Sequence, residues 1–255
     1  MVFDDEKDVL AYTYMVCMNN PLMFTGNSFE KKIFKSFQDV STLVSNNAKD
    51  DLPPDYYSDV HSMMFDVMRV NDTEVKKTYN PVKIRERNME RELQRSGILD
   101  AVAPDCKVIC TSESYDVDEH NYKAYKKNVN RVMQDHIDKI PIWVKEHPDV
   151  KCKGLFVFDE TECYYEGSIH YLGDDKFLRV WDVNHFVLHE PWNDESFIQK
   201  AYDSDLDFVI WACAYKQFSE PPRQMHVSYP SIVIMDVRYP RTRKYSTYNV
   251  ERLVA

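Results

Sequence analysis

Glycine is scarce in this chain of 255 residues: five occur, at Gly26, Gly97, Gly154, Gly167 and Gly173. A Walker-type phosphate loop and a dinucleotide-binding turn both need clustered glycines, because their backbone must approach a phosphate closely. None of the five glycines has the spacing of either loop. These two classes of nucleotide-binding protein are therefore excluded.

Paired cysteines and long apolar runs are also missing. The six cysteines are scattered and form no CxxC pair, which favours reduced structural thiols over metal ligation. No uninterrupted apolar stretch approaches the roughly 18 residues that a membrane span needs. The chain begins with acidic residues rather than with the basic segment of a secretory signal. We expect a cytoplasmic protein that does not associate with membranes.

Positive charge is in short supply as well. The 32 Lys and Arg residues are outnumbered by 42 Asp and Glu residues, which gives a formal net charge of −10. This is the wrong sign for a protein whose main role is to coat nucleic acid. A nuclease stays open, because a carboxylate-lined metal site is itself acidic and bound cations reverse the local field. The same acidity suits a protein that docks on a basic protein surface.

Strand-like and helix-like segments alternate along the chain. Apolar or β-prone runs of strand length predict strands at residues 63–70, 73–79, 107–111, 154–158, 207–215 and 231–239. Helical spacing of apolar residues and capping signals predict helices at residues 6–18, 28–44, 83–96, 119–140 and 195–203. This alternation indicates one α/β domain over residues 1–255, with a mixed β-sheet flanked by helices.

Three details of these elements are specific enough to check. Asn27 or Ser28 caps the second helix, whose apolar face extends to Val40 and Val44. Pro141 kinks the helix at 119–140 rather than ending it, because apolar residues follow. The strand at 63–70 turns at Asn71-Asp72 into the strand at 73–79, which forms a hairpin.

Asp66 lies between Phe65 and Val67 in an apolar strand, where an unpaired carboxylate is costly. Two interpretations remain open. Asp66 faces a functional site, or it lies on the solvent side of an alternating strand.

The order of these elements resembles the PD-(D/E)XK superfamily of restriction-endonuclease-like nucleases. The core of this family runs α-β-β-β-α-β, and the resemblance covers roughly residues 27–160, with residues 161–255 as a C-terminal extension of the sheet. Family members place an acid in or near the first helix, an Asp at the start of the hairpin and a (D/E)xK triplet on the next strand. The resemblance implies four ligands for Mg²⁺ or Mn²⁺: Glu30, Asp55, Asp66 and Glu74. It implies three catalytic residues: Asp66, Glu74 and Lys76.

Carboxylates on adjacent strands converge on a hard cation, which activates water and offsets charge on the phosphate. A lysine two residues after the acid lies on the same face of its strand and can act on that water or phosphate. If Asp66 is itself the acid of the triplet, Met68 stands where the family has lysine. Arg69 or Lys76 would then have to take the role of that lysine.

Three other segments carry chemistry-bearing residues. Asp159-Glu160-Thr161-Glu162 follows the strand at 154–158, where α/β proteins commonly bind ligands, although an ordinary strand exit has the same composition. His185 and His189 lie in an extended segment, where positions four apart are too distant to share a metal. One basic and aromatic cluster predicts binding to nucleic-acid phosphates, or only balances an acidic surface: Arg238, Arg241, Arg243 and Lys244.

Two functions follow from these observations and both remain open. The first is a metal-dependent nuclease-like protein that hydrolyses phosphodiester bonds in DNA or RNA, in a bacterial or phage defence or counter-defence system. The second is a catalytically inactive α/β interaction module or accessory subunit with an acidic docking surface. Nucleic acid, a protein partner and a second copy of the chain are the partners that these functions imply.

Overall fold

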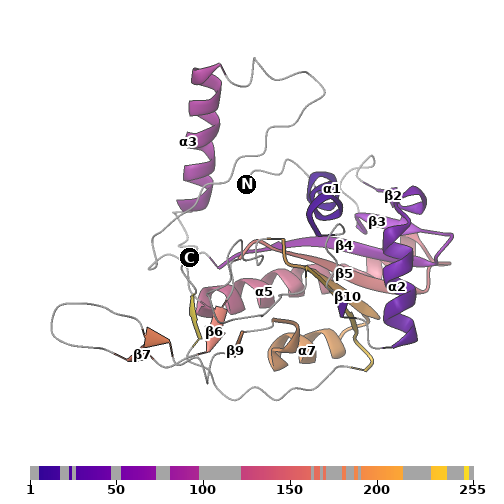
Figure 1. Cartoon of the computed structure of the whole chain (residues 1–255). Helices are drawn as coiled ribbons and strands as arrows, with labels where there is room; N and C mark the ends of the chain where they lie inside the picture. Colours follow the sequence, from indigo (N-terminus) through magenta and orange to yellow (C-terminus); the bar gives the residue numbers. More distant parts are fainter. Residues whose placement is uncertain are drawn as a thin grey trace.

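The computed structural model describes residues 6–17, 23–24, 27–46, 53–72, 81–97, 122–161, 164–166, 169–170, 180–181, 187–188, 191–214, 231–239 and 250–252. Its centre is a seven-stranded mixed sheet in the order β1-β11-β10-β5-β4-β3-β2 (Figure 1). The strands are β1 (Met23–Phe24), β2 (Val44–Ser45), β3 (Tyr56–Ser58), β4 (Met63–Val70), β5 (Cys152–Asp159), β10 (Phe208–Ala212) and β11 (Ile232–Asp236). The predicted α/β class with a mixed sheet is confirmed.

Parallel strands form the middle of this sheet. β4 pairs in parallel with β5, and β5 with β10. The flanking pairs are antiparallel, with β3 beside β4 and β11 beside β10. Strands from the second half of the chain therefore share one sheet with strands from the first half, although the single-domain organisation stays a prediction.

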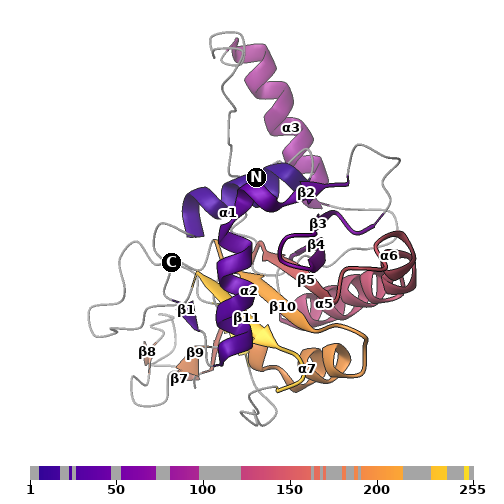
Figure 2. The same ribbon diagram turned by 90° about the vertical axis from the view of Figure 1, so that its right-hand side faces the viewer.

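Helices cover both faces of the sheet (Figure 2). They are α1 (Glu6–Cys17), α2 (Ser28–Gln38), α5 (Tyr122–Ile137), α6 (Ile140–Glu146) and α7 (Glu195–Tyr202). Side chains from α1 and α2 share one apolar cluster with Phe65 and Phe156. Side chains from α5, α6 and α7 share the opposite cluster with Met68 and Leu155. Because both faces are covered, the central strands consist almost wholly of buried residues.

Gly154 marks a close approach inside this sheet. It lies opposite Phe208 in the β5–β10 pair. A Cβ atom at Gly154 would lie 2.1 Å from Cε2 of Phe208. Glycine is therefore needed here for space rather than for an unusual backbone angle.

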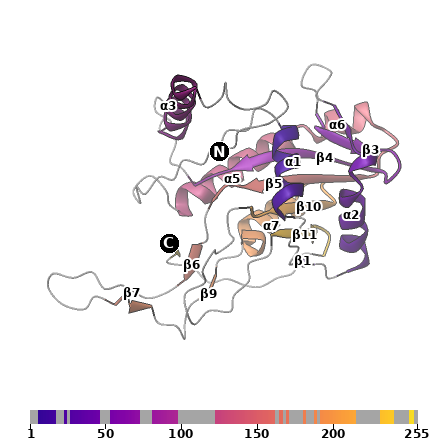
Figure 3. The same ribbon diagram turned by 45° about the horizontal axis from the view of Figure 1, so that its top comes forward.

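Further elements lie outside the sheet and its covering helices (Figure 3). α3 (Pro81–Ser96) projects from them and ends at Gly97, whose φ of 69° suits the left-handed position that follows a helix. β12 (Val250–Arg252), β6 (Tyr164–Glu166) and β9 (Val187–Leu188) form a small sheet, and β7 (Ile169–His170) pairs with β8 (Val180–Trp181). Two short 3₁₀ turns, η1 (Val40–Thr42) and η2 (Pro191–Asn193), complete the described elements. Among the described residues, no helix combines the length and the apolar character that crossing a membrane requires.

Most predicted elements are confirmed, and two helix boundaries are wrong. α2 begins after its cap Asn27 as predicted, but it ends at Gln38 and leaves Val40 and Val44 half-exposed beyond it. The side chain of Asp39 accepts a hydrogen bond from Ser41 at this point, and such local bonds compete with helix continuation.

The predicted helix at 119–140 is two helices rather than one kinked helix. α5 ends at Ile137, and Pro141 lies in the first turn of α6. Proline is well tolerated there because the first turn leaves its N–H positions without helical acceptors.

The predicted hairpin also differs from the structure. The antiparallel partner observed beside β4 is β3, which precedes it in the chain. Residues 73–79 and 107–111, predicted as strands, lie outside the described residues.

Candidate functional site

Asp66 is turned inward by the alternation of β4. Its neighbours Phe65 and Val67 point into the cluster beneath α1 and α2. The Asp66 side chain therefore points to the opposite face, toward α5, and it is only 2% exposed. Of the two interpretations that the sequence left open, placement on a solvent-exposed face is wrong.

Asp55 lies directly across from Asp66. The β3–β4 register pairs Tyr56 with Phe65, so one step further along each strand brings these two acids together. The backbone N–H of Asp55 donates to Oδ1 of Asp66 at 3.0 Å. The N–H of Val67 donates to Oδ2 of Asp55 at 2.7 Å. Two carboxyl groups on paired strands thus form one cluster, which we call the carboxylate pair.

Burial sets the charge of this pair. The pKa of the Asp55 carboxyl is raised from 3.8 to about 8, mainly by desolvation and next by the neighbouring charge of Asp66. The hydrogen bond from Val67 N–H acts in the opposite direction but does not offset these effects. Among the described residues, no Lys or Arg forms an ion pair with either acid. The raised pKa therefore favours a protonated Asp55 at neutral pH.

His136 completes the cluster from the last turn of α5. Its Nδ1 lies 2.5 Å from Oδ2 of Asp66. When Asp66 is ionised its oxygen can only accept, so in that state Nδ1 of His136 is the donor of this hydrogen bond. The His136 side chain is 16% exposed, so the contact is largely shielded from solvent.

Glu30 belongs to a different part of the molecule. It is buried near the start of α2, where Oε2 accepts from Asn27 N–H and Asn27 Oδ1 accepts from Glu30 N–H. Its Oε1 accepts from the backbone N–H of Asp236 on β11. These contacts form a capping box on the face covered by α2, whereas Asp66 faces α5. The structure does not bring Glu30 to Asp66.

Glu74 and Lys76 lie outside the described residues, so the predicted triplet is not placed. Arg69, the other substitute considered for the triplet lysine, donates to Oε1 of Glu160 at 2.7 Å. By alternation it lies on the face opposite to Asp66. Met68, two residues after Asp66, is buried in the apolar cluster beneath α5.

Asp159, predicted as part of a rival site, is buried and has a full set of donors. Tyr125 Oη donates to its Oδ2 at 2.7 Å, and Trp211 Nε1 donates to the same oxygen at 3.0 Å. Thr161 donates to Oδ1 through both its backbone N–H and its hydroxyl group. These bonds tie β5 to α5 and β10, which is a structural role. Glu162 lies outside the described residues.

Arg238 is the one described member of the predicted basic cluster. It forms an ion pair with Asp207, which is almost fully buried. The Arg238 side chain is itself largely exposed, but this pair offsets its charge. Arg241, Arg243 and Lys244 lie outside the described residues, and so do His185 and His189.

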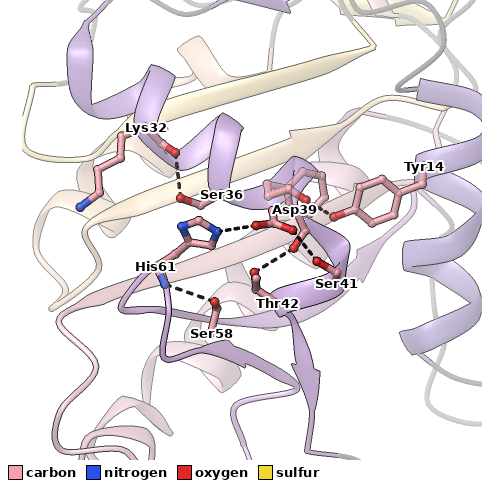
Figure 4. A network of polar contacts seen from close by, with 9 residues as sticks. Tyr14, Lys32, Ser36, Asp39, Ser41, Thr42, Ser58 and His61 are labelled. Atoms are coloured by element: carbon pink, nitrogen blue, oxygen red, sulfur yellow. Dashed lines mark hydrogen bonds and ion pairs between the residues drawn. The ribbon is translucent and has the colours of Figure 1, made fainter.

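A second aspartate–histidine pair joins α2 to the turn between β3 and β4 (Figure 4). His61 Nε2 lies 3.1 Å from Oδ2 of Asp39, and Ser41 donates to Oδ1 of the same acid. The hydrogen bonds from Ser41 and His61 hold the pKa of Asp39 below its usual value. Figure 4 shows Tyr14 reaching the same end of α2, where its hydroxyl group donates to the carbonyl of Phe37.

Within the described part of the chain, no group of three or more His, Cys, Asp or Glu side chains is arranged to hold a metal ion. Comparisons with protein-family models, with curated proteins and with solved structures found no match. The carboxylate pair with His136 is therefore the candidate site on its own geometry.

Sequence reasoning named Asp55 and Asp66 but missed His136. A signal for it was present in α5, where His136 follows Val132 by four residues and Met133 by three. That spacing places His136 beside an apolar face, and a histidine there needs a buried polar partner.

Proposed function

We propose that this protein is a restriction-endonuclease-like hydrolase of phosphodiester bonds in DNA or RNA, and that its carboxylate pair binds Mg²⁺ or Mn²⁺. The observation that carries the proposal is the pairing of Asp55 and Asp66 across β3 and β4. Asp66 is buried and Asp55 half-buried, and no described Lys or Arg is paired with either acid. A divalent cation between two adjacent carboxyl groups would offset the repulsion between their negative charges.

The order of elements supports this assignment. The α-β-β-β-α-β order of the family core is matched by α2, β2, β3, β4, α5 and β5. Two further described helices interrupt it, α3 between β4 and α5 and α6 between α5 and β5. Asp55 stands at the start of the β3–β4 hairpin and Asp66 on the next strand, where the family pattern places its acids. This is the alternative in which Asp66 belongs to the triplet and Met68 replaces its lysine.

The donor set fits Mg²⁺ better than a metal that needs a closed protein cage. Mg²⁺ takes oxygen ligands, keeps several waters and is often held by one or two carboxylates together with substrate phosphates. When ionised, Asp55 and Asp66 each retain acceptor capacity beyond these hydrogen bonds, because an ionised carboxylate has about four acceptor sites. The absence of a third described ligand is compatible with such a site.

When bound, the cation lowers the pKa of a coordinated water and offsets charge that develops on the phosphate oxygens. The chain's own contribution is positional. The N–H groups of Asp55 and Val67 orient the two carboxylates, and the pairing of β3 with β4 keeps them adjacent. Lys76 stays the predicted residue for orienting the water or the phosphate.

A cleavage assay tests the proposal. Purified protein is incubated with plasmid DNA and with single-stranded RNA in Mg²⁺ or Mn²⁺, beside Asp55→Asn, Asp66→Asn and Lys76→Ala variants. The control is Asp59→Asn, which changes an exposed acid in the turn between β3 and β4. We expect cleavage that falls at least about 100-fold in the Asp55 and Asp66 variants and is unchanged in the control. No cleavage, or equal cleavage by all variants, would contradict the proposal.

One observation favours the second function, an interaction module without activity. Met68 occupies the position of the triplet lysine, and its side chain is buried rather than directed at a substrate. A folded protein that binds Mn²⁺ but cleaves neither substrate would support this function. The −10 charge would then favour a partner with a basic surface.

A further inference from the structure

His136 is placed to form a hydrogen bond with Asp66 rather than to bind a metal ion beside it. It reaches the carboxylate from α5, an element separate from the β3–β4 hairpin, and its Nδ1 faces Oδ2 at 2.5 Å. Together with Asp55 N–H on Oδ1, it holds the Asp66 carboxylate at both oxygens. Among the described residues no three His, Cys, Asp or Glu side chains are arranged around one metal position, so His136 is not a third ligand beside the two carboxylates.

We infer that His136 is a positioning residue that fixes the orientation of Asp66 for a divalent cation, an inference that rests on the proposed function. Carboxylates that bind metals are commonly oriented by a hydrogen bond from a neighbouring group, and loss of such a group lowers metal affinity about 10–100-fold. Here His136 on α5 supplies that donor. Two later residues of β4, Met68 and Arg69, do not contact Asp66. Met68 is apolar, and Arg69 is paired with Glu160 on the other face.

The role depends on the N–H of the imidazole and not on the ring as a whole. An asparagine at position 136 can place an amide N–H close to the position of Nδ1, whereas a leucine fills similar space without a donor. A glutamine extends the amide by one more bond. The three substitutions therefore separate hydrogen bonding from packing.

The experiment measures Mn²⁺ affinity by electron paramagnetic resonance for the full chain and for His136→Leu, His136→Asn and His136→Gln. His61→Leu is the matched control, because it removes the histidine of the other aspartate–histidine pair. Circular dichroism melting verifies that each variant is folded. Affinity is read without any substrate, so the result does not depend on cleavage.

We expect the affinity of His136→Leu to fall about tenfold or more, while His136→Asn and His61→Leu stay close to the unsubstituted protein. If His136→Leu does not fold, the comparison of His136→Gln with His136→Asn takes its place. A weaker Mn²⁺ affinity for His136→Gln supports the inference, and equal Mn²⁺ affinities overturn it.

Two other results would overturn the inference while leaving the cation site in place. One is an unchanged affinity for folded His136→Leu. The other is an equal loss for His136→Leu and His136→Asn, which would make the imidazole itself a ligand. If the unsubstituted protein binds no Mn²⁺, the proposed function fails and the inference fails with it.

Discussion

Two aspartate–histidine pairs among the described residues lie at different depths in this protein. Asp39 and His61 meet at the surface, with 42% and 23% of their side chains exposed, at a distance of 3.1 Å. Asp66 and His136 meet beneath α5, with 2% and 16% exposed, at 2.5 Å. The residue types are the same, but only the buried pair has a second carboxyl group beside it.

The difference shows how burial turns an ordinary contact into a candidate site. At the surface, water screens Asp39 and its contacts mainly connect α2 to the β3–β4 turn. Inside, strand alternation forces Asp66 inward, and the register of β3 brings Asp55 against it. Desolvation and mutual repulsion then raise the pKa of Asp55, which surface acids do not experience.

Replacing each aspartate with alanine should give the largest difference between the two pairs, measured as loss of unfolding free energy. We expect Asp66→Ala to lower the free energy of unfolding by about 2 kcal/mol, because Asp55 N–H and His136 lose a buried acceptor. Asp39→Ala should have a much smaller effect, since water replaces its contacts. Urea unfolding of both variants at neutral pH measures the two losses. Equal losses would remove the distinction between the pairs.

A second expected effect concerns pH. The folded protein keeps a proton on Asp55 between about pH 4 and pH 8, whereas the unfolded chain releases it near the lower value. Stability that Asp55 contributes is therefore present at low pH and is lost as pH rises through this window. Asp55→Asn cannot ionise, so its stability relative to the unsubstituted protein should increase by up to about 1.4 kcal/mol per pH unit.

Urea unfolding at several pH values across this window measures that increase, and Asp59→Asn serves as the exposed control. Parallel stability curves for Asp55→Asn and the unsubstituted protein would show that Asp55 titrates normally.

The smallest effect is expected at the surface pair. The pKa of Asp39 is lowered, so the stability it contributes is present above its unfolded pKa and is lost as pH falls through its folded pKa. Thermal melting should show a small advantage of the unsubstituted protein over Asp39→Asn near neutral pH. High salt should reduce this advantage, because exposed charges are screened. An advantage that persists in strong acid would contradict the assignment.

Long, strongly patterned elements could be predicted from the sequence. The strand at 63–70 has the predicted bounds, and the apolar run at 154–158 is a central strand, because nearly continuous apolar residues are typical of strands buried on both faces. The cap Asn27 also follows a local rule, since its side chain accepts the backbone N–H of Glu30 at the start of α2.

The antiparallel partner of β4 could not be predicted in the same way. β3 has three residues, too few to show a period, so the sequence favoured residues 73–79 as the partner of β4. The pairing of Asp55 with Asp66 depends on that register, and the contact with His136 depends on how α5 crosses the sheet. Both are tertiary features that no local pattern contains.

The proposed cation site requires that a divalent cation displaces the proton held by Asp55 in the carboxylate pair. Carboxyl-carbon NMR of ¹³C-labelled aspartate, assigned with Asp55→Asn, measures this titration directly. We predict a pKa for Asp55 of about 8 without a divalent cation and a clear decrease in saturating Mg²⁺. A pKa near the ordinary value without Mg²⁺, or a raised pKa that Mg²⁺ leaves unchanged, would contradict the proposed cation site.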